Sequence, residues 1–324
     1  MALTKEYIFT LTCLKEIGIK GVGPKKVLAI GSAINDKKLS IESLEDLASL
    51  MRTMKENAIN GVSLDDLQKA YKYAINIVEA SKAEGIGLKG YYDEDFPESL
   101  RKTVDEDGKV NPPLLLWYRG DFSITKLPGI AVIGTREPTK EGTIGGKYLA
   151  CEFSKRGFNI VSGLATGCDT CGHQGALDAN GKTTAILANG LDGKSIYPPE
   201  NRELAENIVN RGGLLLSEYP INTSVNRYSL VARDRLQSGL AQATLVIQTG
   251  KVGGTMHAAK ATMEANKPLY VMLFKNEETN KQEKCLGNEI LHEQGAIYIK
   301  GNDNIDDICN NIRNRKVIKT DLFD

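Results

Sequence analysis

Residues 130–176 read IAVIGTREPTKEGTIGGKYLACEFSKRGFNIVSGLATGCDTCGHQGA, and this stretch decides the fold. It begins with a short apolar run, Ile130 to Ile133. A glycine-containing loop follows this run, and a helical pattern follows the loop. A second apolar run, Phe158 to Val161, ends in another small polar loop. The order strand, loop, helix, strand, loop predicts a βαβ unit.

The two loops of this unit are predicted to form a ligand site. In parallel sheets, ligands bind beyond the carboxyl ends of the strands, so Gly134-Thr135-Arg136 and Ser162-Gly163 should lie side by side there. Small polar loops offer backbone N–H groups to an anion, often a phosphate. Arg136 is predicted to pair with that phosphate in a bidentate manner, and the alternative is an arginine stacked over the sheet edge.

The rest of the chain extends this pattern. From residue 130 to about 300, seven apolar runs alternate with helix-like segments, which predicts an α/β fold: a Rossmann-like, doubly wound parallel sheet covered on both faces. Residues 1–88 are predicted to be a small helical accessory domain without a convincing strand. Residues 89–300 are predicted to form the extended Rossmann-like domain, and residues 301–324 a C-terminal helix and a charged tail.

The helical region contains a glycine-rich turn, GIKGVGPKKV, at residues 18–27. It resembles a helix-hairpin-helix element, in which glycines let the backbone approach a phosphate and lysines add charge. A tight turn with solvated lysines is the equally favoured alternative. The candidate contacts with phosphate or duplex DNA are Gly21, Gly23, Lys25 and Lys26.

Net charge, apolar runs and cysteine spacing limit the classes of function that fit this sequence. The formal net charge is zero, which argues against a protein that coats nucleic acid by bulk charge but is compatible with a local basic patch. No apolar run approaches the length of a transmembrane helix and the N-terminus does not resemble a signal peptide, so we expect no membrane contact and a cytoplasmic protein. The six cysteines are scattered, and Cys168 and Cys171 lack further ligands at zinc spacing, so we expect no metal.

The sequence does not predict an enzyme. The first loop is not G-x-G-x-x-G, and the glycine-rich segment at residues 250–255 is not a P-loop, so no bound cofactor is expected. No serine or cysteine has a base at an identifiable spacing. His173 is predicted to be a structural histidine, and Asp169 the N-cap of its helix.

Two further segments favour an anionic ligand. Three arginines, at positions 227, 233 and 235, surround Tyr228, which suits single-stranded nucleic acid; the alternative is a solvated helix face paired with Asp234. Gly253-Gly254-Thr255 opens a predicted helix, where backbone N–H groups favour an anion.

Together these motifs resemble the DNA-processing protein A family (DprA, also called Smf). The family pattern corresponds here to Gly134-Thr135-Arg136, Ser162 to His173, Tyr197 to Asn201, Ser217 to Pro220, Arg233-Asp234-Arg235 and Gly253 to Ala258. The order and number of these motifs make the resemblance specific over roughly residues 89–273.

Several positions depart from the family pattern and indicate a divergent branch. Thr135 replaces a serine, Asp234 replaces the asparagine of Arg-Asn-Arg, and Leu230-Val231 replaces Phe-Pro, with Tyr228 a candidate substitute for the missing aromatic ring. The chain ends soon after the last predicted strand, so the C-terminal winged-helix domain of many members is not expected.

The resemblance implies a non-enzymatic single-stranded-DNA-binding protein. It would act as a recombination mediator that loads a RecA-type recombinase, in natural transformation or DNA recombination, and it would form a homodimer. By the same resemblance, phosphates would meet Arg136, Arg233 and Arg235, and further backbone or hydroxyl contacts would come from Gly134, Thr135, Ser162, Gly163, Gly254 and Thr255.

Two other functions remain open. The same loops could hold a nucleotide in a sensor related to LOG-type proteins, with a role in defence; Met256-His257 stands where LOG-type hydrolases place a glutamate, so hydrolysis is not expected. The chain could also be an interaction scaffold with vestigial sites, for which Asp234 is the main indication.

Overall fold

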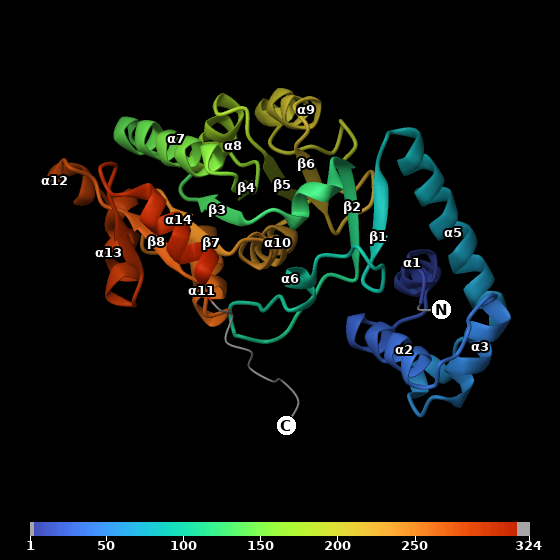
Figure 1. The fold of residues 1–324 in the computed structure, drawn as a ribbon. Coiled ribbons are helices and arrows are strands. Elements are labelled where there is room, and N and C mark those ends of the chain that lie inside the picture. Colours follow the sequence, from blue (N-terminus) through green and yellow to red (C-terminus); the bar gives the residue numbers. More distant parts are fainter. Residues whose placement is uncertain (1–2, 316–324) are drawn as a thin grey trace.

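A nine-stranded sheet forms the centre of the molecule in the computed structural model, which describes residues 3–315 (Figure 1). The strand order is β1-β2-β6-β5-β4-β3-β7-β8-β9. Seven neighbouring strands, from β6 to β9 in this order, are parallel. The strands are β1 (Gly87–Gly90), β2 (Leu115–Gly120), β3 (Gly129–Ile133), β4 (Asn159–Ser162), β5 (Thr183–Leu187), β6 (Leu214–Ser217), β7 (Ala243–Val246), β8 (Leu269–Met272) and β9 (Ile297–Ile299).

Helices cover both faces of the sheet, which confirms the doubly wound α/β prediction. Alternating side chains of a strand serve the two faces: in β6, Leu215 packs in one cluster while Leu214 and Leu216 pack in another. One face carries α7 (Lys140–Lys155), α8 (Cys168–Asp178), α9 (Arg202–Asn210) and α14 (Ile305–Asn314). The other carries α6 (Glu98–Arg101), α10 (Arg227–Leu240), α11 (Gly254–Glu264) and α13 (Leu286–Glu293). The remaining short elements are η2 (Phe122–Lys126), η3 (Pro199–Asn201), α12 (Glu277–Asn280) and η4 (Glu283–Cys285).

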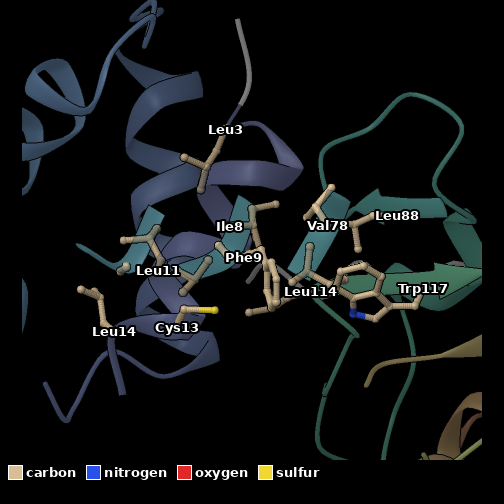
Figure 2. Packing of buried hydrophobic residues seen from close by; sticks show 14 of the residues in the cluster. Leu3, Ile8, Phe9, Leu11, Cys13, Leu14, Val78, Leu88, Leu114 and Trp117 are labelled. Atoms are coloured by element: carbon tan, nitrogen blue, oxygen red, sulfur yellow. The ribbon is translucent and has the colours of Figure 1, made fainter. Parts of the chain in front are cut away.

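The N-terminal helices pack against the β1–β2 edge (Figure 1). They are α1 (Lys5–Cys13), η1 (Leu14–Ile17), α2 (Pro24–Asp36), α3 (Leu44–Thr53), α4 (Asn57–Asn60) and α5 (Leu64–Ala83). Ser63 and Asp66 form a capping box at the start of α5. Figure 2 shows Phe9 of α1 directed toward Trp117 of β2, with ring centroids 5.2 Å apart at an edge-to-face angle of 81°. The helices and the sheet edge therefore share one hydrophobic core.

The sheet differs from the prediction at one edge. β1 pairs with β2, and β2 with β6, in antiparallel orientation, so the sheet is mixed and not wholly parallel. Residues 91–114 connect β1 to its neighbour β2 and contain the short helix α6, and β2 runs antiparallel to β1. The boundary predicted after residue 88 falls inside β1, whose Gly-Leu-Lys-Gly sequence carries almost no strand pattern.

The C-terminal helix packs on the sheet region. Ile305, Cys309 and Ile312 of α14 join the cluster that contains Phe153 and Phe158. The charged tail predicted at the end of the chain lies outside the described residues from position 316 onward. In residues 3–315, no helix has the length and apolar character that crossing a bilayer requires.

Candidate nucleic-acid interface

The strand order creates a crevice at the carboxyl edge of the sheet. From β3 the chain proceeds outward through β4, β5 and β6, and it then returns to place β7 on the other side of β3. Loops that follow β3 and β7 diverge at such a switch point, and ligands of α/β proteins bind there. The candidate site therefore lies at the ends of β3, β4, β5 and β7.

The loop after β3 lies against the loop after β4, as predicted. The Cys168 N–H donates to the Thr135 carbonyl at 3.1 Å, and the Thr135 N–H donates to the Gln248 carbonyl at 2.7 Å. A Cβ on Gly134 would lie 2.6 Å from the Cys168 sulfur, so only glycine fits between these loops. Gly134 and Thr135 thus hold the loops together, and the Thr135 N–H is already engaged.

Arg136 projects from this loop with an exposed side chain. Within the described chain, its guanidinium has no hydrogen bond or ion pair. The loop is anchored on both sides of it, because the Glu137 N–H donates to the Thr135 hydroxyl and the Thr139 N–H to the Gln248 side chain. Arg136 therefore extends a charged hydrogen-bond donor from a fixed backbone, and its guanidinium is available to bind an external anion.

The loop after β4 uses its polar groups internally. The Ser162 hydroxyl donates to the Val132 carbonyl at 2.6 Å, and the Gly163 N–H donates to Asp169 at 3.0 Å. Asp169 is not the predicted N-cap: Gly167 caps α8, and the Asp169 carboxylate accepts the Gly163 and Ala165 N–H groups from inside the helix. Burial raises the pKa of Asp169, and nearby Arg233 opposes this rise.

Arg233 lies over Gly163. Its Nη1 donates to the Ile186 carbonyl at 2.7 Å and its Nε to Asp234 at 3.1 Å. The guanidinium is so close to Gly163 that a Cβ at this position would overlap it. In residues 3–315, Nη2 has no hydrogen-bond partner, although the residue is only 6% exposed. Position 163 must therefore be glycine, because the Arg233 guanidinium occupies the space that a side chain would need.

Arg235 is held in a different network, two residues further along α10. Its two terminal nitrogens each donate to Glu218 at 2.8 Å, its Nε donates to the Asn111 carbonyl at 2.8 Å, and Nη1 also contacts the Ala232 carbonyl. The residue is 7% exposed. A phosphate would have to displace Glu218 to bind this side chain.

Gly254 and Thr255 form the first turn of α11, and Gly253 precedes them at φ +133°. Gly254 is exposed and Thr255 is partly buried. The position that a Cβ on Gly254 would take lies 3.4 Å from an Asp234 carboxylate oxygen. The turn is therefore next to Asp234.

A pocket of about 260 Å³ brings part of the predicted set together. Arg136, Gly163 and Arg233 line it, and Tyr197 and Leu230 contribute further walls. The other six predicted site residues are not among its lining residues: Gly134, Thr135, Ser162, Arg235, Gly254 and Thr255. Tyr197 belongs to the motif Tyr197 to Asn201 of the family resemblance but was not predicted as a site residue; it is 40% exposed, and the motif was the available signal.

His173 is a structural histidine, as predicted. It is fully buried, and its Nδ1 lies 2.7 Å from the Thr183 hydroxyl. That hydroxyl donates to the Ile160 carbonyl, so His173 Nδ1 must be the donor to Thr183. Burial lowers the pKa of His173 to about 3. The neutral ring thus ties α8 to β5.

The cysteines have no metal-binding arrangement. All six are free, and residues 3–315 hold no group of three or more His, Cys, Asp or Glu side chains that could ligate an ion. Burial raises the pKa of both Cys168 and Cys171, which disfavours thiolate chemistry at this C-x-x-C.

The glycine-rich turn of the helical region lies between η1 and α2. Gly21 has φ +90° and packs against Ala58, and Gly23 is the N-cap of α2. Lys25 is exposed, whereas Lys26 lies 3.6 Å from Glu56. The turn therefore fits a tight interhelix connection, and a phosphate contact through its lysines stays a prediction.

Comparisons with known proteins add the context of a family. A sequence profile described as DNA recombination-mediator protein A matches residues 88–313. The protein Smf of Synechocystis is 35% identical over 214 residues, which span 65% of this chain but only 51% of that relative, so the match covers about half of its length. The DNA processing protein DprA of Bacillus subtilis is 28% identical over 71% of this chain and 75% of its own.

Solved structures agree with the fold. DprA of Streptococcus pneumoniae superposes with a TM-score of 0.71 over 94% of this chain and 98% of its own, at 23% identity. DNA processing protein A of Helicobacter pylori, whose structure concerns its single-stranded DNA binding mode, gives a TM-score of 0.57 at 29% identity. That match covers 70% of this chain and 95% of the other.

Proposed function

Since this chain belongs to the DNA recombination-mediator protein A family, we propose that it binds single-stranded DNA at the carboxyl edge of its sheet. The observation that carries the proposal is the pocket that exposed Arg136, buried Arg233 and Gly163 line together. Guanidinium groups bind phosphate oxygens through charge-assisted hydrogen bonds, which give affinity without base specificity.

The strand would enter by way of Arg136 and continue along the start of α10. Tyr228 is 86% exposed in the first turn of that helix, where a ring can stack on a base. Stacking on an aromatic side chain tolerates any base and suits unpaired strands. Gly254 and Thr255 lie beside α10 and offer helix N-terminal N–H groups to a further phosphate.

The proposal assigns a binding role and no catalytic step. His173 is neutral and engaged with Thr183, and the thiol of Cys168 has a raised pKa, so neither serves as a nucleophile or base. Loading of a RecA-type recombinase, assembly into a homodimer and a cytoplasmic location are part of the same proposal, and family membership supports them.

An Arg136→Ala variant should bind single-stranded DNA about ten- to a hundredfold more weakly than the parent chain, the loss expected for one or two charge-assisted hydrogen bonds. Fluorescence anisotropy of a labelled oligothymidine measures this. The matched control is Lys126→Ala, because Lys126 is an exposed cation just before β3, at the opposite edge of the sheet. Equal losses in both variants would contradict a site at the carboxyl edge.

A Gly163→Ala variant should displace the Arg233 guanidinium and weaken single-stranded DNA binding about tenfold, which is about 1.4 kcal/mol. Gly193→Ala is the matched control, since a Cβ at Gly193 meets no atom within 4 Å. Circular dichroism establishes that both variants are folded before their anisotropy is compared. Full affinity in Gly163→Ala would remove Arg233 from the site.

A nucleotide sensor is the second candidate, because both Arg136 and Arg233 line the pocket. A thermal shift with nucleoside phosphates in a chain that does not bind single-stranded DNA would favour that function. At a hundredfold excess of ligand over Kd the stabilisation is about 2.7 kcal/mol.

A further inference from the structure

Two buried carboxylates flank Arg233, the buried arginine of the pocket. Asp234 accepts the Arg233 Nε–H at 3.1 Å, and Asp169 contributes a second negative charge close enough to raise the pKa of Asp234. The exposed fractions of Asp169, Arg233 and Asp234 are 6%, 6% and 8%. With both carboxylates ionised, this cluster carries a net charge of −1 at the place where a phosphate is proposed to bind.

The surroundings of Asp234 supply few compensating charges. From α10, Gln237 donates an amide N–H to the same carboxylate oxygen as Arg233, at 3.1 Å. From α11, the first turn at Gly254 faces the other oxygen, and His257 lies near enough to favour the ionised carboxylate. His257 itself is paired with Glu106 of the loop before β2, and Arg235 is paired with Glu218.

The two carboxylates differ in how they could take up a proton. One Asp169 oxygen accepts two backbone N–H groups, which stabilise the charged form. In Asp234, both hydrogen bonds go to Oδ1, and Oδ2 has no hydrogen-bond partner among residues 3–315. A proton can therefore reside on Asp234 Oδ2 without breaking a bond.

A phosphate next to Arg233 would add a second net negative charge inside a poorly solvated cluster. Repulsion between like charges is strong where water is excluded, so it favours the protonated form of the nearest carboxyl group. The pKa of Asp234 is raised to about 6, chiefly by burial and in addition by Asp169, against the opposing effects of Arg233 and His257. Close to neutral pH, only a small free energy separates the two forms.

We propose that Asp234 restrains the phosphate site by neutralising Arg233, and that a DNA phosphate binds there together with one proton taken up by Asp234. This inference rests on the proposed function, since it concerns regulation of the same site. It makes the affinity for single-stranded DNA depend on pH through one identified carboxyl group.

The test is oligothymidine anisotropy on the whole chain between pH 5.5 and 8.0 at constant ionic strength. In the parent chain, Kd should rise with pH, approaching tenfold per pH unit at the alkaline end, because one proton is linked to binding. Asp234→Asn should bind at least tenfold more tightly than the parent at pH 8.0 and lose most of the pH dependence.

Two control variants separate this effect from general charge. Asp307→Asn makes the same charge change at an exposed position in the first turn of α14. The neighbouring Asp306, which forms an ion pair with Arg156 at the end of α7, is left intact. His257→Gln removes the imidazole that lies near Asp234. Both should keep the pH dependence of the parent chain, and thermal melting confirms that each variant is folded.

The outcomes are distinct. An unchanged pH dependence in Asp234→Asn, or its loss in His257→Gln alone, overturns the assignment to Asp234 while single-stranded DNA binding stands. A failure of both the parent chain and Asp234→Asn to bind single-stranded DNA at every pH overturns the proposed function and this inference with it.

Discussion

An Arg235→Ala variant is expected to lose about 3–5 kcal/mol of unfolding free energy, the usual cost of breaking a buried ion pair by removing one partner. Arg235 forms a bidentate ion pair with Glu218 and also donates to the Asn111 carbonyl, so its loss leaves these acceptors unsatisfied. Urea unfolding followed by circular dichroism measures the change.

Arg119→Ala is the matched control for this loss. Arg119 forms the same bidentate ion pair with Glu206, with both hydrogen bonds at 2.7 Å, but its side chain is 24% exposed and that of Glu206 is 44% exposed. Exposed pairs contribute about 1 kcal/mol or less. If Arg235→Ala keeps full stability but loses single-stranded DNA binding, then Arg235 contacts phosphate, as the family resemblance implies.

The second large effect concerns acid stability. Burial lowers the pKa of His173 from 6.5 to about 3, so the unfolded chain binds a proton at this residue over a range in which the folded chain does not. The unfolding free energy should therefore fall as the pH drops from about 6.5 to about 3. At about 1.36 kcal/mol for each pH unit, the full contribution is roughly 5 kcal/mol.

Chemical unfolding of the parent chain and a His173→Gln variant at several pH values isolates this contribution. The variant should be less stable at pH 7, where the contact with Thr183 is weakened, yet lose less stability on acidification. The comparison is needed because the raised pKa values of Asp169 and Asp234 act in the opposite direction. Parallel pH curves for the two chains would contradict a neutral buried imidazole.

The regular part of the fold could be predicted because its signals are local. Strands β3 and β4 lie within one residue of the bounds of the apolar runs Ile130 to Ile133 and Phe158 to Val161, and the adjacent loops after them followed from the βαβ pattern. β1 was missed because Gly-Leu-Lys-Gly has no alternation, and its pairing depends on β2, nearly 30 residues away.

The site was harder to predict because its contacts are long-range. Arg235 looks like its neighbour Arg233 in the sequence, but only the fold brings Glu218 and Asn111 to it. Ser162 carries a hydroxyl at a strand end, and its direction toward Val132 is set by the neighbouring strand. The types of side chain predicted an anionic ligand. Which of these side chains are free to bind it depends on their hydrogen-bond partners in the fold.

The central claim is that single-stranded DNA binds through phosphate contacts at the carboxyl edge, and the salt dependence of binding tests it most directly. Anisotropy of matched single-stranded and duplex oligonucleotides should show tighter binding of the single strand. The logarithm of the association constant should fall with the logarithm of salt concentration, with a slope near −0.7 for each phosphate contacted. Arg136→Ala should make that slope shallower by about 0.7. No binding at low salt, or an identical slope in Arg136→Ala, would contradict the claim.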